Sequence, residues 1–322
     1  MAIPQRYGMT VPFGGPLADH KDRFRELVDL GYTDAWSAEA DGTDAFSPLL
    51  LAAAWAPELR LGTAIVPAYT RSPALLAQSV ASLAEAAPGR VAFGIGTSSN
   101  VIVERWNGIP FEQPYQRTKE SLQFVKRALE GGKVEGEWKT FSSNGFKLGR
   151  VPKVKPDYLV AALRPGMLRM AAKESDGAIT NWLGADDVPK VKAELGDDKE
   201  LVARILVAPN PDAEVVRKAA RYAIAAYLNV PVYAQFHEWL GRGEVLKPMW
   251  EAWAAGDRKA ALAAIPDSVC DELIVHGPPE ACREQLARYH ANGITTSALA
   301  VMPFGVDPDQ AVRDLAPSTW AR

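Results

Sequence analysis

The chain has 322 residues, of which 48% are hydrophobic and 23% charged, and its formal net charge at pH 7 is −3. This size suits one (β/α)8 barrel with insertions or two smaller domains, and the composition is that of a globular protein with a large core. Because the sequence has no basic excess, no apolar signal core and no membrane-length apolar run, it argues against nucleic-acid and membrane functions and predicts a cytoplasmic protein.

Short apolar runs alternate with amphipathic segments through the first hundred residues. Ser47 and Ser72 each precede a proline, so we expect both to be N-caps of the helices that follow. Strands and helices that alternate with short connections are typical of a parallel sheet. The predicted strands are 7–12, 33–38, 61–67 and 90–96, and the predicted helices are 17–30, 47–55 and one that begins at 73.

Two longer segments interrupt this alternation. The first, 99–156, contains a predicted short helix at 101–106, a helix at 115–129 and a hairpin within 131–149. The second, 212–264, is predicted to be helical. The remaining predicted strands are 158–162, 177–181, 201–208 and 294–301, and the remaining predicted helices are 165–175, 185–195 and 279–291.

Eight predicted strands with helices between them favour a closed barrel over an open doubly wound sheet. No linker, low-complexity tract or short-period repeat divides the sequence. We therefore predict an α/β fold, a (β/α)8 TIM barrel formed by a single domain of residues 1–322. Its insertions follow the fourth strand, at about 99–156, and the seventh strand, at about 212–264.

The fourth predicted strand ends in small and hydroxyl-bearing residues, Gly94-Ile-Gly96-Thr97-Ser98-Ser99. Ligands bind at the carboxyl ends of parallel strands, so we expect ligand contact here. A dinucleotide fingerprint is not supported, because Ser99 replaces the third glycine and the motif lies on the fourth strand rather than the first. The alternative is that the two glycines only allow close packing of strand and helix.

Polar residues also follow other predicted strands. Glu39 follows the second strand, where it either meets a ligand or forms a salt bridge or loop cap. Asn181 and Trp182 follow the sixth strand and offer an amide beside a large amphipathic ring. Arg164 precedes a helix N-terminus, which favours an anion, although such an arginine is commonly only solvated.

The remaining polar residues exclude several classes of site. The four histidines fit no metal-binding spacing, so no metal site is predicted. Cys270 and Cys282 are expected to be buried thiols rather than a disulfide. No G-x-S-x-G, H-E-x-x-H or P-loop sequence is present, which argues against a hydrolase, a zinc protease or an NTPase.

Six segments in this order resemble the luciferase-like monooxygenase superfamily of flavin and deazaflavin barrels, and most closely its F420-dependent oxidoreductase branch. The resemblance covers nearly the whole chain. The segments are Trp36-Ser-Ala-Glu39, Arg60-Leu-Gly-Thr-Ala-Ile-Val-Pro67 with Thr70-Arg-Ser-Pro-Ala74, Gly89-Arg-Val-Ala-Phe-Gly-Ile-Gly-Thr-Ser98, Asp157-Tyr-Leu-Val-Ala-Ala-Leu163, Asp176-Gly-Ala-Ile-Thr-Asn-Trp182 and His276-Gly-Pro-Pro-Glu-Ala-Cys-Arg283.

The resemblance implies a barrel that holds a planar ring system at its carboxyl-end mouth. It also implies a cis peptide bond between Ala64 and Ile65 behind the ring, and substrate entry under Phe13, Trp106 and Trp182. Glu39 is the candidate for tuning the ring or relaying a proton. The implied cofactor-binding residues are Glu39, Thr63, Ala64, Ile65, Gly96, Thr97, Ser98, Ser99, Ala162, Leu163, Arg164 and Asn181.

The sequence departs from some deazaflavin dehydrogenases of this family. These carry Asp-His at the second strand, where the histidine is a base, whereas this chain has Ala38-Glu39-Ala40. It also has Ser99 where sugar-phosphate dehydrogenases of the family have Glu. We therefore expect an unidentified small organic substrate rather than a sugar phosphate.

The main functional hypothesis is an oxidoreductase that moves a hydride between the deazaflavin of coenzyme F420 and this substrate. One alternative is a two-component monooxygenase that uses FMN and oxygen on the same barrel. Another is a non-catalytic protein that binds flavin or deazaflavin. Relatives of this kind are often dimers, so the resemblance also implies a homodimer.

Overall fold

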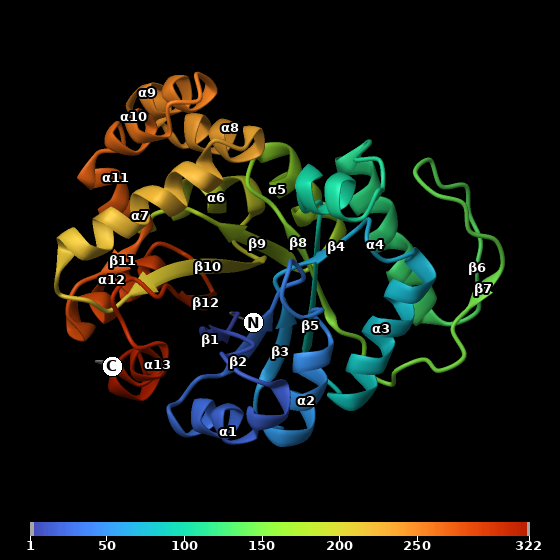
Figure 1. The fold of residues 1–322 in the computed structure, drawn as a ribbon. Coiled ribbons are helices and arrows are strands. Elements are labelled where there is room, and N and C mark those ends of the chain that lie inside the picture. Colours follow the sequence, from blue (N-terminus) through green and yellow to red (C-terminus); the bar gives the residue numbers. More distant parts are fainter. Residues whose placement is uncertain (1–2, 321–322) are drawn as a thin grey trace. The chain divides into compact units, whose positions relative to one another are not determined.

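The computed structural model describes residues 3–320. Strands and helices alternate along the chain, and the predicted fold class, a (β/α)8 barrel, is confirmed (Figure 1). The chain forms two compact units. The N-terminal unit comprises 6–162 and 166–179, and the C-terminal unit comprises 180–322 with the short pieces 1–5 and 163–165.

The N-terminal unit is built on a parallel sheet whose neighbouring strands follow one another in the sequence. Its apolar runs are buried on both faces, as parallel strands covered by helices require. Leu61 pairs with Val91, and Phe93 pairs with Tyr158. The strands, in order across the sheet, are β1 (Arg6–Thr10), β2 (Asp34–Ser37), β3 (Arg60–Thr63), β5 (Val91–Gly96), β8 (Asp157–Ala161) and β9 (Gly177–Asn181), with β4 (Val66–Pro67) paired to β5. The last two residues of β9 belong to the C-terminal unit.

The helices of this unit lie where the sequence pattern predicts them, outside the strands (Figure 1). The first predicted helix begins as a separate short turn, η1, before α1. The helices are η1 (Leu17–Asp19), α1 (Lys21–Asp29), α2 (Ser47–Trp55), α3 (Pro73–Ala86), the π-helix η2 (Val101–Trp106), α4 (Pro114–Glu130) and α5 (Pro165–Glu174).

Of the two serines predicted to be N-caps, one caps its helix and the other does not. The Ser72 side chain accepts a hydrogen bond from Leu75 N, so the cap of α3 is confirmed. The expected Ser47 cap of α2 is wrong, because Ser47 already lies inside the helix. The carboxylate of Asp44 accepts hydrogen bonds from Phe46 N at 2.9 Å and Ser47 N at 3.0 Å, and so satisfies the free N–H groups of this helix end.

The first insertion contains the predicted hairpin. Its strands β6 (Lys133–Val134) and β7 (Phe146–Lys147) are antiparallel. The Trp138 and Phe141 rings stack with centroids 5.2 Å apart, and both contact Phe124 of α4. These aromatic contacts hold the hairpin segment against α4.

The C-terminal unit contains three parallel strands in the order β11, β10, β12. The second predicted insertion is helical as expected, whereas β11, α11, α13 and η4 were not predicted. The strands are β10 (Glu200–Ala208), β11 (Val275–His276) and β12 (Thr296–Val301). The helices are η3 (Ala185–Asp187), α6 (Val188–Leu195), α7 (Ala213–Leu228), α8 (Pro231–Leu240), α9 (Gly243–Ala254), α10 (Arg258–Ala263), α11 (Asp267–Leu273), α12 (Pro279–Ala291), α13 (Pro308–Asp314) and η4 (Pro317–Thr319).

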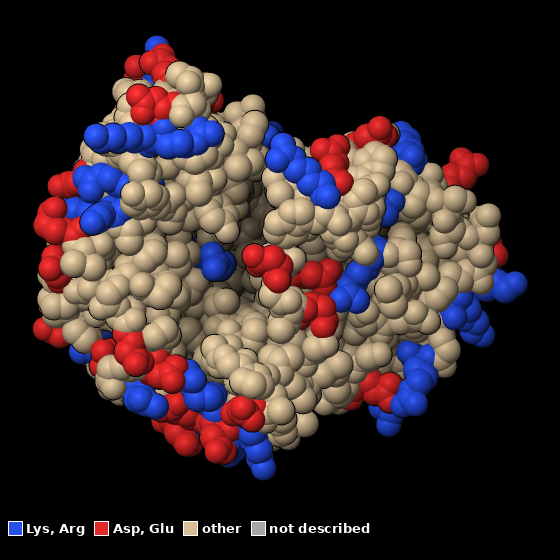
Figure 2. All heavy atoms as spheres, in the orientation of Figure 1, with Lys and Arg blue, Asp and Glu red and all other residues tan. Residues whose placement is uncertain are grey.

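Both cysteines are free and buried, as predicted. Burial raises the pKa of Cys270 to about 11 and that of Cys282 to about 12. Among residues 3–320, none of the helices combines the length and apolar character needed to cross a bilayer. On the face shown in Figure 2, acidic and basic side chains are interspersed, which agrees with the small net charge.

Candidate functional site

The sequence predicts one continuous third strand over 61–67. This prediction is wrong, because the strand is divided into β3 and β4. The break is the peptide bond between Ala64 and Ile65, which is cis, and this prediction from the family resemblance is confirmed. The last residue of β2 and the chain just after it hold the break from one side. Ala64 N donates to Ser37 O at 2.6 Å, and Glu39 N donates to Ile65 O at 3.1 Å.

Thr63 joins β3 to β5 just before this break. Its side chain is buried, and its hydroxyl donates to Gly94 O and accepts from Gly94 N, both at 2.8 Å. The hydroxyl therefore replaces ladder hydrogen bonds at the point where β3 leaves the sheet. Thr63 supports the carboxyl end of β3, and its hydroxyl already has a donor and an acceptor within the protein.

The two glycines of β5 are required by packing. A Cβ on Gly94 would lie 2.0 Å from Thr63 O, and one on Gly96 would lie 2.7 Å from Ala161 Cβ. These distances leave no room for any side chain. Close packing against neighbouring strands, the alternative stated for this motif, therefore accounts for both glycines, while ligand contact by Gly96 stays a prediction.

Thr97, Ser98 and Ser99 follow β5 and are partly exposed. Ser98 has a φ of 61°, a left-handed conformation that non-glycine residues rarely adopt. The Ser99 hydroxyl accepts from Ile102 N, in the first turn of η2, at 3.3 Å. Within the described part of the chain, the backbone N–H groups of Ser98 and Ser99 donate no hydrogen bond. This turn therefore presents two unused donors at the end of a buried strand.

The Glu39 carboxylate has protein partners at both oxygens. Oε2 accepts from Arg71 Nη2 at 2.8 Å and Arg71 Nε at 3.1 Å, and Oε1 accepts from Thr70 at 3.0 Å. A salt bridge was one of the two roles that the sequence allowed for Glu39, and the structure contains it. Two hydrogen bonds from Arg71 to one oxygen and one from Thr70 to the other hold the carboxylate in place.

A second carboxylate extends this network. Asp44 Oδ1 lies 3.5 Å from Arg71 Nη2, and the Arg71 guanidinium lies over the Phe46 ring, 5.1 Å from its centroid. Burial alone would raise the pKa of Asp44, but hydrogen bonds from Ser47 and Phe46 and the charge of Arg71 hold it below its usual value. Arg71 therefore ties the segment after β2 to the segment after β4.

The predicted substrate-pocket residues of the N-terminal unit differ in their surroundings. Phe13 packs edge-on against Phe24 and His20, and the Arg23 guanidinium lies 4.4 Å from its centroid. Trp106, on η2, is 55% exposed. Phe13 is therefore part of the packing around α1, whereas the ring of Trp106 is available for contact.

The other predicted residues lie close to the boundary of the N-terminal unit or in the C-terminal unit. Ala162 is buried, and its N–H donates to Ile179 O at 2.9 Å. Leu163 and Arg164 belong to the C-terminal unit, where the Arg164 guanidinium hydrogen-bonds to Gln235. Arg164 therefore has a protein partner rather than being only solvated.

Asn181 and Trp182 form a compact turn at the end of β9. Asn181 Oδ1 accepts from Trp182 N at 2.9 Å, and Trp182 has a φ of 57°. The Trp182 ring is buried, and its centroid lies 5.1 Å from that of Tyr227 on α7. Trp182 is therefore held by the helices of the second insertion.

The structure thus brings one group of predicted residues together at the carboxyl ends of β2, β3 and β5. This group, which we call the strand-end site, consists of Glu39, Thr63, Ala64, Ile65, Gly96, Thr97, Ser98 and Ser99. Sequence reasoning missed Arg71, the partner of Glu39, and Arg204, a cation within β10. Arg204 could have been found in the sequence as the one charged residue between apolar residues within the predicted strand 201–208.

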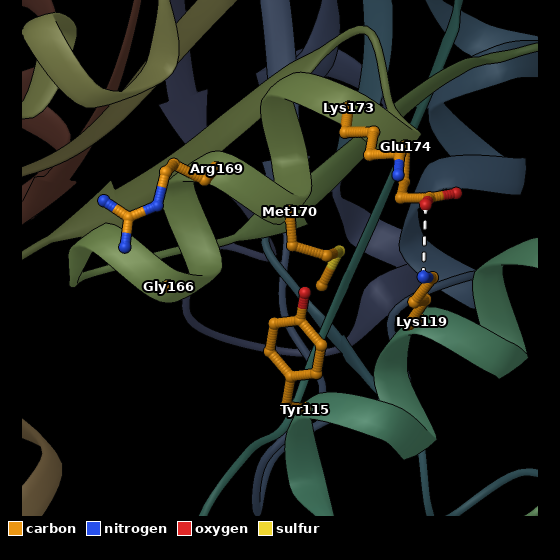
Figure 3. A pocket seen from close by; sticks show the side chains of 7 residues that line it. All are labelled: Tyr115, Lys119, Gly166, Arg169, Met170, Lys173 and Glu174. Carbon is orange, nitrogen blue, oxygen red and sulfur yellow. Dashed lines mark ion pairs between the residues drawn. The ribbon is translucent and has the colours of Figure 1, made fainter.

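A separate hollow of about 460 Å³ lies between α4 and α5 (Figure 3). Lys119 of α4 pairs with Glu174 of α5 at 3.3 Å. The hollow contains none of the predicted site residues and lies in the helical layer, so we do not assign the function to it. Its lining residues are Tyr115, Lys119, Gly166, Arg169, Met170, Lys173 and Glu174.

Comparisons with known proteins agree with this architecture. The chain is 27% identical over 303 residues to a 5,10-methylenetetrahydromethanopterin reductase of Archaeoglobus fulgidus. This alignment covers 88% of this chain and 90% of the relative. The structure of a coenzyme F420 dependent tetrahydromethanopterin reductase from Methanopyrus kandleri matches with a TM-score of 0.75, at 19% identity and over 98% of both chains.

A second solved structure has the same fold. An F420-dependent secondary alcohol dehydrogenase in complex with an F420-acetone adduct matches with a TM-score of 0.75, at 16% identity, over 99% of this chain and 100% of the other. The family model described as luciferase-like monooxygenase matches residues 1–296. The chain therefore belongs to the luciferase-like monooxygenase family.

Proposed function

We propose that the protein is a coenzyme F420-dependent oxidoreductase that transfers a hydride between the deazaflavin and a small organic substrate. The observation that carries this proposal is the likeness, over nearly the full length of both chains, to a reductase and a dehydrogenase that depend on F420. The relative at 27% identity is also named as a reductase. Fold alone does not define a reaction, so the strand-end site must also suit the coenzyme.

The strand-end site suits a flat ring that carries polar atoms along one edge. Ala64 and Ile65 are apolar and partly exposed, and the Ile65 side chain lies against Gly96, the last residue of β5 before the turn that carries the unused N–H groups of Ser98 and Ser99. When bound, F420 supplies the ring carbon that accepts or donates the hydride. We assign Ala64 and Ile65 to packing against the ring, and the N–H groups of Ser98 and Ser99 to binding an oxygen of the coenzyme.

Glu39 is better suited to positioning than to proton transfer. Both of its oxygens are engaged, by Arg71 and by Thr70, and its own N–H holds Ile65 O. We therefore propose that Glu39 fixes the segment that contacts the coenzyme. The other predicted cofactor residues, Gly96, Thr97, Ala162, Leu163, Arg164 and Asn181, and the substrate-pocket residues Phe13, Trp106 and Trp182, are retained as part of this proposal.

Binding tests the cofactor assignment. Purified protein is titrated with F420 and separately with FMN while its tryptophan fluorescence is followed. We expect saturable F420 binding that is tighter than FMN binding. Tighter FMN binding would replace the proposal with the monooxygenase alternative, and no binding of either would overturn it.

Two variants at Ser98 test the assignment of its backbone. S98G keeps both the N–H and the left-handed conformation but removes the hydroxyl, so F420 binding is expected to match that of the wild type. S98V disfavours the conformation and is expected to weaken binding. Thermal unfolding of both variants separates this effect from loss of the fold.

Turnover tests the reaction. Reduced F420 is mixed with enzyme and a panel of small carbonyl and alkene acceptors, and the visible band of the oxidised coenzyme is followed. Return of the band with at least one acceptor supports the oxidoreductase. Tight binding without turnover over the whole panel would favour the non-catalytic alternative.

We further propose that both units form one domain of residues 1–322 and that the protein acts as a cytoplasmic homodimer. Two buried, free thiols support a reducing compartment. The family resemblance supports the dimer. Light scattering during size-exclusion chromatography gives the mass, and a value near that of one 34.9 kDa chain would overturn the dimer.

A further inference from the structure

Arg204 lies in the middle of β10, within the C-terminal unit. It pairs in register with Ala298 of β12, and apolar residues precede and follow it along the strand. Arg204 is partly buried, whereas every other residue of β10 is buried. An arginine stays charged in proteins at neutral pH, and a charge removed from water is costly unless it is paired.

Other partly buried arginines of this unit have carboxylate partners. Arg217 lies 2.7 Å from Asp271, and Arg242 lies 2.8 Å from Asp187. Arg204 differs, because within residues 3–320 no carboxylate lies within ion-pair distance of it. The groups that interact electrostatically with it are the phenols of Tyr227 and Tyr233, and burial lowers the pKa of Arg204.

Tyr227 and Tyr233, the two phenols near Arg204, connect it to the polar groups of Asn181 and Trp182. Asn181 hydrogen-bonds to Tyr233, which interacts in turn with Arg204. Trp182 Nε1 is buried and has no hydrogen-bond partner among the described residues. Tyr227, whose ring contacts Trp182 in a tilted arrangement, is 47% exposed, so the cluster reaches the surface of its unit. A cation, an amide and phenols form a donor set that fits an oxyanion.

We propose that Arg204, together with Asn181 and Tyr233, binds a carboxylate or phosphate group of a small-molecule ligand. This inference rests on the proposed function, since the oxyanion belongs either to the coenzyme or to the substrate. The guanidinium donates two parallel hydrogen bonds to two oxygens of the carboxylate or phosphate, and the neutral side chains of Asn181 and Tyr233 donate further hydrogen bonds to the same group. The ligand thereby supplies the counter-charge that the protein does not.

The test compares R204Q and R204K with R258Q, which changes an exposed arginine of α10. Inorganic phosphate and acetate serve as probes, and their protection against thermal unfolding is measured for each protein. We expect both anions to protect the wild type and R258Q, and to lose most of this effect on R204Q. R204K should be intermediate, because lysine keeps the charge but not the planar fork.

The stability of the ligand-free proteins separates binding from a structural role. Without anions, R204Q should unfold at or above the wild-type temperature, because an uncompensated charge has been removed. A clear loss of stability in R204Q that R204K restores would overturn the proposal. Equal protection of R204Q and wild type by both anions would overturn it as well.

F420 titrations identify the source of the oxyanion. A dissociation constant for F420 that rises about tenfold or more in R204Q assigns the oxyanion to the coenzyme. An unchanged constant, with phosphate or acetate still protecting the F420-saturated wild type, assigns it to the substrate. If the wild type fails to bind F420 but anion protection still depends on Arg204, the proposed function fails and this inference stands.

Discussion

Arg71 Nη2 lies 2.8 Å from Glu39 Oε2, and this pair connects two segments that are 32 residues apart in the chain. One segment follows β2 and the other follows β4. The side chains of both residues are largely buried, with exposed fractions of 15% for Glu39 and 18% for Arg71. Removing either partner would therefore leave the other charge largely buried and uncompensated, at a greater cost than in an exposed ion pair.

Breaking this pair tests whether Glu39 positions the site or transfers a proton. E39Q and R71Q are each expected to lower the free energy of unfolding by about 1–3 kcal/mol, because each leaves a hydrogen-bonding partner unsatisfied, with the double variant losing less than the sum. Urea denaturation followed by circular dichroism measures all three. If E39Q abolished turnover while leaving both stability and F420 affinity unchanged, proton transfer by Glu39 would be supported instead.

The Thr63 hydroxyl is expected to be essential to the junction of β3 and β5. T63V keeps the shape of the side chain but leaves Gly94 N–H and Gly94 C=O without their partner, at a cost of about 1–3 kcal/mol. T63S keeps the hydroxyl and is the matched control. Equal unfolding midpoints for T63V and T63S would show that water replaces the hydroxyl without cost.

A methyl group at Gly94 is expected to disrupt the sheet. The added Cβ would lie 2.0 Å from Thr63 O and 2.4 Å from Ile179 Cδ1, so G94A should lose roughly 3 kcal/mol or more, or fail to fold. G149A is the control, because nothing lies within 4 Å of a Cβ there. The yield of folded protein and the unfolding temperature report the difference. A G94A protein as stable as G149A would contradict the packing explanation.

His237 is expected to make the protein less stable in mild acid. Burial, helped by the charge of Arg242, lowers the pKa of His237 to about 3. In the unfolded chain the same ring titrates near 6.5, so the unfolded state binds the extra proton as pH falls below that value. At about 1.4 kcal/mol per pKa unit, His237 alone lowers the free energy of unfolding by about 2 kcal/mol between pH 7 and pH 5.

The variant H237F isolates this contribution. Its free energy of unfolding should change less between pH 7 and pH 5 than that of the wild type, whatever its absolute stability. His290 stays in place in both proteins and provides a common background, since burial lowers its pKa to about 4. Parallel pH profiles for wild type and H237F would contradict a neutral, buried His237.

The local elements of this fold could be predicted from the sequence because each carries its own pattern. Apolar runs and proline starts gave the same bounds as the structure for α2, η2 and α12. The elements that were missed, α11, α13, β11 and η4, have seven, seven, two and three residues. Two helical turns contain too few positions for a periodic pattern to stand out.

The candidate site could be predicted only in part, because its contacts depend on residues far apart in the chain. Glu39 was recognisable as a carboxylate at a strand end, but its partner Arg71 could be identified only from the structure. The importance of Arg204 was hidden for the opposite reason. A missing counter-ion becomes evident only once all neighbours of the side chain are known.

The state of Cys270 and Cys282 has a practical consequence. Thiol reagents react with exposed thiolates, and both of these groups are protonated and buried at neutral pH. A cysteine introduced at Trp106 on η2, or at Tyr227 on α7, would then be the preferred target of a maleimide dye in the otherwise native chain. Fluorescent probes placed in this way would report ligand arrival in real time without prior removal of the natural cysteines.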